Sequence, residues 1–186
     1  MASLESVGLA AEFVLPTATA FPAAPGAATP FWLLFLAGLS LNFVVQTIGG
    51  LGEEIGWRGY MLTRLIDARV PYPVLVSGLI WGAWHLPLLL GGIYQTGPNV
   101  LLSALLFMVA VTVSAWFYAQ LRLATGSIWP VIILHGAWNT IIHDVFDAST
   151  SGAQATLWIG ESGILVMLAV IAVSVLLMRT WRPRTA

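Results

Sequence analysis

Five apolar segments, each about as long as a lipid bilayer is thick, recur along the chain and limit what it can fold into. They cover residues 30–50, 74–90, 100–119, 127–146 and 163–178. A helix needs about 20 apolar residues to cross a hydrocarbon core of about 30 Å. Only 8% of the residues are charged, whereas soluble domains carry about 25%. The sequence therefore predicts an all-α polytopic integral membrane helix bundle, with about five transmembrane spans plus a motif-bearing helix.

The same segments divide the chain into three parts. Residues 1–29 are rich in Ala, Pro and Thr and lack the basic start of a signal peptide, so they predict an irregular N-terminal arm. Residues 30–180 form the predicted membrane domain. Residues 181–186 form a predicted basic cytoplasmic tail.

The arginines predict how the chain is oriented in the membrane. The chain has no Lys, and in a five-span arrangement all seven Arg residues fall on one side of the bilayer. By the positive-inside rule that side is cytoplasmic, which places the N-terminus outside and the C-terminus inside. The Lys-free, Ala-rich composition is typical of a bacterial protein, so we expect a bacterial plasma membrane. On the opposite side, Asp144 and Asp147 are expected to be solvated loop carboxylates, and Glu161 lies in the same loop.

The predicted partners are the lipid bilayer and a membrane-associated peptide or protein. No basic patch exists outside the membrane ends, so no nucleic-acid partner is expected. The chain has no Cys, which excludes disulfides and thiolate chemistry. The sequence does not indicate an oligomeric state.

The segment 52–60 concentrates charge directly after the first span. Glu53, Glu54 and Arg58 follow a run of some twenty apolar residues, and a charge at mid-bilayer costs about 2.5 to 3.5 kcal/mol. In a helix, Glu54 and Arg58 stand at i and i+4, the favourable order for a salt bridge. Glu53 points about 100° away from Glu54 around the helix. We therefore predict a structural role for the pair Glu54–Arg58 and a chemical role for Glu53.

Two further spans carry polar groups in the same half of the predicted membrane. His85 lies in the second span, and His135 and Asn139 lie at i and i+4 in the fourth. Taken singly, each histidine could be a hydrogen-bonded structural residue, and Asn139 could join two helices. Together with Glu53 they predict a polar site between three helices that opens towards the cytoplasm.

Tryptophans flank these polar groups. Trp81, Trp84 and Trp138 lie within four residues of a candidate site residue, so they are candidate walls of a substrate pocket. Packing within the bundle is the alternative for all three.

Small residues predict where the helices approach each other closely. Gly52 and Gly56 form a small-xxx-small pair, as do Gly78 and Gly82, and Gly136 adds a further small position beside His135. Such residues let the backbones of membrane helices come together.

Three motifs in order resemble a known family. They are Glu-Glu-x-x-x-Arg at residues 53–58, an aromatic residue followed four positions later by His85, and His135 followed four positions later by Asn139. This order, with each motif on its own membrane helix, resembles the CPBP family of CAAX prenyl endopeptidases and bacteriocin-processing or immunity proteins, also called Abi proteins. Trp81 stands at the aromatic position, where the family often has Phe.

The resemblance implies an intramembrane glutamic-type endopeptidase in residues 30–180. Glu53 and His85 would activate a water molecule, and His135 and Asn139 would donate hydrogen bonds to the oxyanion. The implied substrate is a membrane-associated peptide or protein, CAAX-type prenylated or otherwise lipid-embedded, and no cofactor is implied.

Two alternatives remain open from the sequence. Glu53, His85 and His135 could instead be three zinc ligands of a metalloendopeptidase with an open fourth position, although the chain has no His-Glu-x-x-His motif. The same cluster could also belong to a non-catalytic membrane immunity or scaffolding protein.

Overall fold

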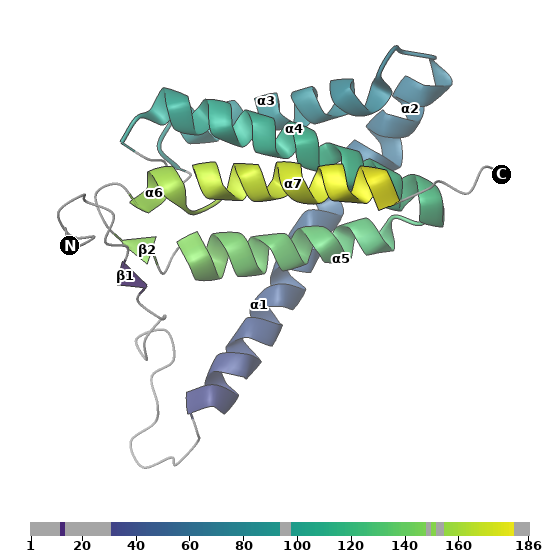
Figure 1. Cartoon of the computed structure of the whole chain (residues 1–186). Coiled ribbons are helices and arrows are strands. Elements are labelled where there is room, and N and C mark those ends of the chain that lie inside the picture. The colour runs from purple at the N-terminus through teal and green to yellow at the C-terminus, as the bar shows by residue number, and fades with distance from the viewer. Residues whose placement is uncertain (1–11, 14–30, 94–97, 148–149, 152–154, 181–186) are drawn as a thin grey trace.

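The computed structural model describes residues 12–13, 31–93, 98–147, 150–151 and 155–180, and over these the chain is a bundle of helices (Figure 1). The predicted all-α class is confirmed. The helical elements are α1 (Phe31–Glu54), η2 (Ile55–Met61), α2 (Leu62–Asp67), α3 (Pro73–Leu90), α4 (Val100–Thr125), α5 (Trp129–Trp138), η3 (Asn139–Asp147), α6 (Ala155–Trp158) and α7 (Ile164–Thr180). One short antiparallel pair joins β1 (Glu12–Phe13) to β2 (Thr150–Ser151). The predicted tail, residues 181–186, and most of the predicted arm lie outside the described residues.

Local sequence explains where the long helices begin and end. Pro73 occupies the first position of α3, where its missing N–H costs nothing. Asn99 caps α4, since its side chain accepts a hydrogen bond from the backbone N–H of Leu102 at 3.0 Å. Gly126 ends α4 in the left-handed conformation, with φ 66°. These boundaries agree closely with the predicted second span and extend the third.

Two π-helical segments interrupt the α-helical geometry next to the predicted motifs. The segment η2 follows α1 directly after Glu54, and η3 follows α5 with Asn139 as its first residue. Such wider turns are frequent at functional sites. The acidic motif therefore lies within one continuous helix formed by α1, η2 and α2. The fourth predicted span, residues 127–146, covers α5 and η3 as far as Phe146, and Asp147 follows it.

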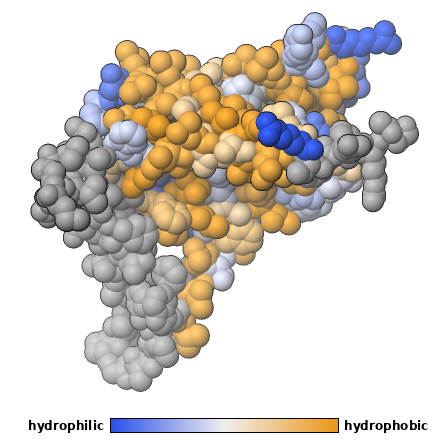
Figure 2. All heavy atoms as spheres, viewed as in Figure 1, coloured by the Kyte–Doolittle hydropathy of each residue, from blue (hydrophilic) through white to orange (hydrophobic). Residues whose placement is uncertain are grey.

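The surface of the bundle is largely apolar, as expected for an integral membrane protein. Among the described residues, α3 and α4 are long and apolar enough to cross a membrane, and α7 is a shorter apolar helix. Along α1, Leu41 and Ile48 are 67% and 65% exposed. Figure 2 shows hydrophobic residues over most of the visible described face. The number of spans remains a prediction.

The basic ends of the helices lie together. Figure 1 places α2 and the C-terminal ends of α4 and α7 at the same end of the bundle. Arg64, Arg122 and Arg179 lie in the last turns of these three helices. These three basic residues therefore lie at one end of the bundle, as the topology prediction requires. Which side of the membrane this end faces stays a prediction.

Glycines bring two pairs of helices into close contact. A Cβ on Gly78 would lie 3.0 Å from the carbonyl oxygen of Thr112, which shows how closely α3 packs on α4. A Cβ on Gly136 would lie 2.7 Å from the Cα of Thr47, where α5 crosses α1. The prediction was wrong for Gly52 and Gly56, because a Cβ at either position would meet nothing within 4 Å.

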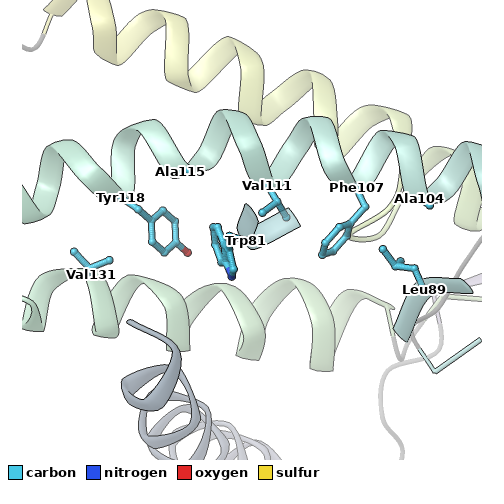
Figure 3. Close-up of a cluster of buried hydrophobic side chains, with 8 residues drawn as sticks. All are labelled: Trp81, Leu89, Ala104, Phe107, Val111, Ala115, Tyr118 and Val131. Carbon is cyan, nitrogen blue, oxygen red and sulfur yellow. The ribbon is translucent and has the colours of Figure 1, made fainter. Parts of the chain in front are cut away.

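The core between α3, α4 and α5 holds large aromatic side chains. Trp81, Phe107 and Tyr118 are between 1% and 5% exposed. Figure 3 shows all three rings in the space between α4 and α5. They surround the polar residues described next.

Candidate active site

The last turn of α1 places two neighbouring carboxylates in different surroundings. The side chain of Glu54 is fully buried, and that of Glu53 is 27% exposed. They point differently because successive residues of a helix are turned by about 100°. Of these two carboxylates, only that of Glu53 lines the cavity between the helices.

The Glu54 carboxylate joins α1 to two other parts of the chain. Its Oε1 atom accepts hydrogen bonds from Arg58 Nη1 at 2.7 Å and from His135 Nδ1 at 2.8 Å. The predicted salt bridge between Glu54 and Arg58 is therefore present, and it is almost completely buried. The Arg58 guanidinium lies 3.9 Å from the centroid of the Trp81 ring and 4.6 Å from that of Tyr118. These stacking contacts add to the electrostatic pairing.

Two indoles hold the Glu53 carboxylate. Its Oε2 atom accepts hydrogen bonds from Trp57 Nε1 at 3.2 Å and from Trp81 Nε1 at 3.1 Å. Its Oε1 atom lies 3.9 Å from His135 Nε2, which is too long for a direct hydrogen bond. One water molecule can bridge two polar atoms at such a separation.

The two histidines are fixed through their Nδ1 atoms. His85 Nδ1 lies 2.9 Å from the carbonyl oxygen of Trp81, and a carbonyl only accepts, so Nδ1 carries the proton. Nε2 of a neutral His85 is therefore an acceptor. His135 Nδ1 faces Glu54, so His135 can donate from Nε2 only when both of its ring nitrogens are protonated.

These side chains line one cavity at the centre of the bundle. The centre of a water molecule can move through about 40 Å³ of it, and one water needs about 10 to 15 Å³. The cavity therefore has room for a few water molecules. Its polar lining consists of Glu53, His85, Ser114, Tyr118, His135, Asn139 and Glu161.

The structure thus brings together all four residues for which the sequence predicts a catalytic role. Their roles stay predictions. Of the three candidate walls, Trp81 and Trp138 line the cavity. Trp84 is 50% exposed and packs its ring on His85, with centroids 4.8 Å apart.

Sequence reasoning missed three polar residues of the cavity, Ser114, Tyr118 and Glu161, and the last of them is charged. Glu161 lines it although it belongs to the segment between η3 and α7, and its Oε1 accepts a hydrogen bond from Trp138 Nε1 at 2.7 Å. The two residues are 23 positions apart, and no motif connects them. The cavity therefore reaches towards the end of the bundle that carries this connection, which is the predicted outer side.

The expectation that Asp144 and Asp147 are solvated was wrong. Asp144 Oδ2 accepts hydrogen bonds from Gln46 and, at 2.9 Å, from Asn42 on α1. Asp147 is 6% exposed, and both of its carboxylate oxygens face the backbone N–H of Glu161 at 3.1 and 3.2 Å. Burial of this connecting residue raises the pKa of Asp147 to about 6.

The residues do not present a ready metal site. Over the described part of the chain, no three His, Asp or Glu side chains are grouped closely enough to hold a metal ion. His135 Nδ1 already faces Glu54, and its Nε2 lies 3.9 Å from Glu53. The geometry gives no support to a zinc ion on Glu53, His85 and His135, and we derive no step through one.

The fold and the cavity together define an integral membrane helix bundle with a buried carboxylate and histidine site. The family model of the type II CAAX prenyl endopeptidases, described as Rce1-like, matches residues 29–141, which is more than half of the chain. The chain belongs to this family, so the resemblance to CPBP proteins is confirmed. No curated protein and no solved structure matches the chain.

Family membership places the chain among CAAX-type intramembrane proteases in general. The matched residues include every one of the predicted catalytic residues and end just after Asn139. Glu161 lies outside the match.

Proposed function

We propose that the protein is a glutamic-type intramembrane endopeptidase that hydrolyses a peptide bond in a lipid-embedded substrate. The observation that carries the proposal is the common cavity of Glu53, His85, His135 and Asn139, which has room for water. Polar side chains at membrane depth are costly and are by default functional. The proposed substrate class is a CAAX-type prenylated or otherwise lipid-anchored peptide.

In the proposed reaction Glu53 is the general base. Trp57 and Trp81 hold its Oε2, so Oε1 is the oxygen directed at water in the cavity. As the water oxygen attacks the scissile carbonyl carbon, Glu53 takes one water proton. His85 Nε2 accepts a hydrogen bond from the same water and aligns it. General base catalysis of this kind typically contributes about 100- to 10,000-fold to the rate.

The attack produces a tetrahedral intermediate with a negatively charged oxygen. The Nε2–H of a doubly protonated His135 and the side-chain amide of Asn139 donate hydrogen bonds to that oxygen. The C–N bond then breaks, and Glu53 returns its proton to the leaving amine. The products are a carboxylic acid, which keeps the second water proton, and an amine, and Glu53 ends as the carboxylate it was at the start.

Glu54 and Arg58 support the reaction without touching the substrate. Glu54 fixes the His135 ring through Nδ1, which leaves Nε2 directed at the cavity. Arg58 neutralises Glu54, so the buried motif adds no net charge of its own beside Glu53.

Hydrolysis of a lipidated reporter peptide in detergent tests this function. The native protein should cleave the reporter equally well with and without EDTA. His85→Gln should lower kcat by about 100-fold or more. The matched control is His143→Gln, because His143 lies outside the cavity lining on η3 and should leave kcat unchanged.

Two results would contradict the proposal. Loss of cleavage in EDTA, with metal found in the purified protein, would favour the zinc metalloendopeptidase. Full biological activity of His85→Gln would favour the non-catalytic immunity or scaffolding protein.

A further inference from the structure

Trp138 separates the catalytic cavity from a second space. That space is an apolar groove of about 190 Å³ between α4, α5 with η3, and α7. The groove is lined by Phe117, Ile142, Val166, Ala169 and Val173, together with Trp138 and Val170. Trp138 and Val170 also line the catalytic cavity. These two side chains are therefore the wall between a polar space and an apolar one.

A hydrogen bond fixes the Trp138 part of this wall. The indole N–H donates to Glu161 Oε1 at 2.7 Å. An indole in an apolar groove has few other acceptors, and a bond to a carboxylate is among the stronger ones in proteins. The orientation of the ring therefore depends on where Glu161 is held.

The connection before α7 holds Glu161 in place. The backbone N–H of Glu161 donates to the buried Asp147 carboxylate. Gly160 has a φ of 90°, which favours glycine, and a Cβ there would collide with Asp147. Gly163 N–H donates to the Gly160 carbonyl at 2.9 Å. The backbone around Glu161 is thus constrained on both sides.

We propose that Glu161 is a positioning residue that holds the Trp138 indole as the closed wall between the catalytic cavity and the apolar groove. The inference rests on the proposed function, since it assigns the cavity to the reaction. A substrate segment that enters the cavity from the groove has to turn the indole and break its bond to Glu161. The segment after the family match therefore controls access to the site.

Thiol labelling tests the wall without any use of catalysis. The natural chain has no Cys, so Ser114→Cys introduces a single thiol into the cavity lining. N-ethylmaleimide should label it slowly in detergent. Adding Glu161→Leu removes the acceptor and should speed labelling at least about tenfold. Glu161→Gln keeps an acceptor oxygen and should restore slow labelling.

Two controls separate the wall from a general loss of structure. Ala124 lies at the exposed C-terminal end of α4. A thiol introduced there by Ala124→Cys should therefore be labelled at the same rate whether or not Glu161 or Trp138 is replaced. Trp138→Phe keeps a ring but removes the donor, so it should also speed labelling of Ser114→Cys. Combined with Glu161→Leu it should add little further, because both changes remove the same hydrogen bond.

The inference would be overturned if Ser114→Cys were labelled at the same rate in three proteins: the otherwise native chain, the Glu161→Leu variant and the Trp138→Phe variant. It would also be overturned by faster labelling with Glu161→Gln that equals that of Glu161→Leu. Failure of the native protein to cleave any reporter would count against the proposed function alone, because the labelling rates do not depend on hydrolysis.

Discussion

Replacement of Glu54 by Gln should destabilise the bundle strongly. The Glu54 side chain is fully buried, and its Oε1 accepts from Arg58 Nη1 at 2.7 Å and from His135 Nδ1 at 2.8 Å. The Gln side chain keeps an oxygen for these donors but loses the negative charge. Arg58, which is 1% exposed, is then a buried cation without its counter-ion.

The size of the effect follows from the separation and burial of the pair. Two unit charges about 4 Å apart interact by about 4 kcal/mol at an effective dielectric constant of about 20. Breaking a buried ion pair on one side typically costs about 3 to 5 kcal/mol. For a chain of this length each kcal/mol lowers the midpoint of thermal unfolding by about 2 to 4 °C. We therefore expect Glu54→Gln to lower the midpoint by about 10 °C.

Thermal unfolding of purified variants in one detergent measures this difference. Asp67→Asn is the matched control, because its ion pair with Arg64 is 3.4 Å long and about two-thirds exposed; such pairs contribute about 1 kcal/mol or less. The double variant Glu54→Gln/Arg58→Met should recover part of the loss, since Arg58 is then no longer a buried cation without its counter-ion. A midpoint for Glu54→Gln within about 2 °C of the native value would refute this account of the buried pair.

Three further predictions concern the site, the helix crossing and the connection before α7. Asn139→Ala should lower kcat for reporter hydrolysis by about 100- to 1000-fold with little change in thermal stability, as loss of one oxyanion donor does; a change under about threefold would remove Asn139 from that role. Gly136→Ala should cost about 1 to 3 kcal/mol in the free energy of unfolding, because the new Cβ would lie 2.7 Å from Thr47 Cα, whereas Gly49→Ala meets nothing within 4 Å and should be neutral. Asp147 has its pKa raised to about 6 by burial, so its charged form destabilises the fold above that pH and stability is regained as pH falls through 6. Between pH 7 and pH 5 the native midpoint should therefore rise by about 2 to 4 °C relative to that of Asp147→Asn, and parallel curves for the two proteins would contradict this.

The sequence predicted the features that depend on local spacing. The apolar segments mark the long helices because a bilayer demands about 20 apolar residues per crossing. The i and i+4 spacing of Glu54 and Arg58 predicted their salt bridge, which is present. The different orientation of Glu53 also follows from helix geometry alone.

Features that depend on contacts between distant residues could not be predicted. His135 and Glu54 are 81 positions apart, so their hydrogen bond depends on how α5 crosses α1. That crossing uses Gly136 against Thr47, and neither position carries a signal for its partner. The indole of Trp81 reaches Glu53 across 28 positions. Its position four residues before His85 predicted only that it would line a pocket wall or pack within the bundle.

The most direct test of the central claim is the rate of reporter cleavage by Glu53→Gln. Gln is nearly the same size as Glu and can still accept hydrogen bonds from Trp57 and Trp81, which hold Glu53, but it cannot take a proton from water. We predict that kcat falls by about 100- to 10,000-fold, that the midpoint of thermal unfolding stays close to the native value, and that Asp67→Asn cleaves as the native protein does. A folded Glu53→Gln protein that cleaves at the native rate would show that Glu53 is not the base and would contradict the proposed mechanism.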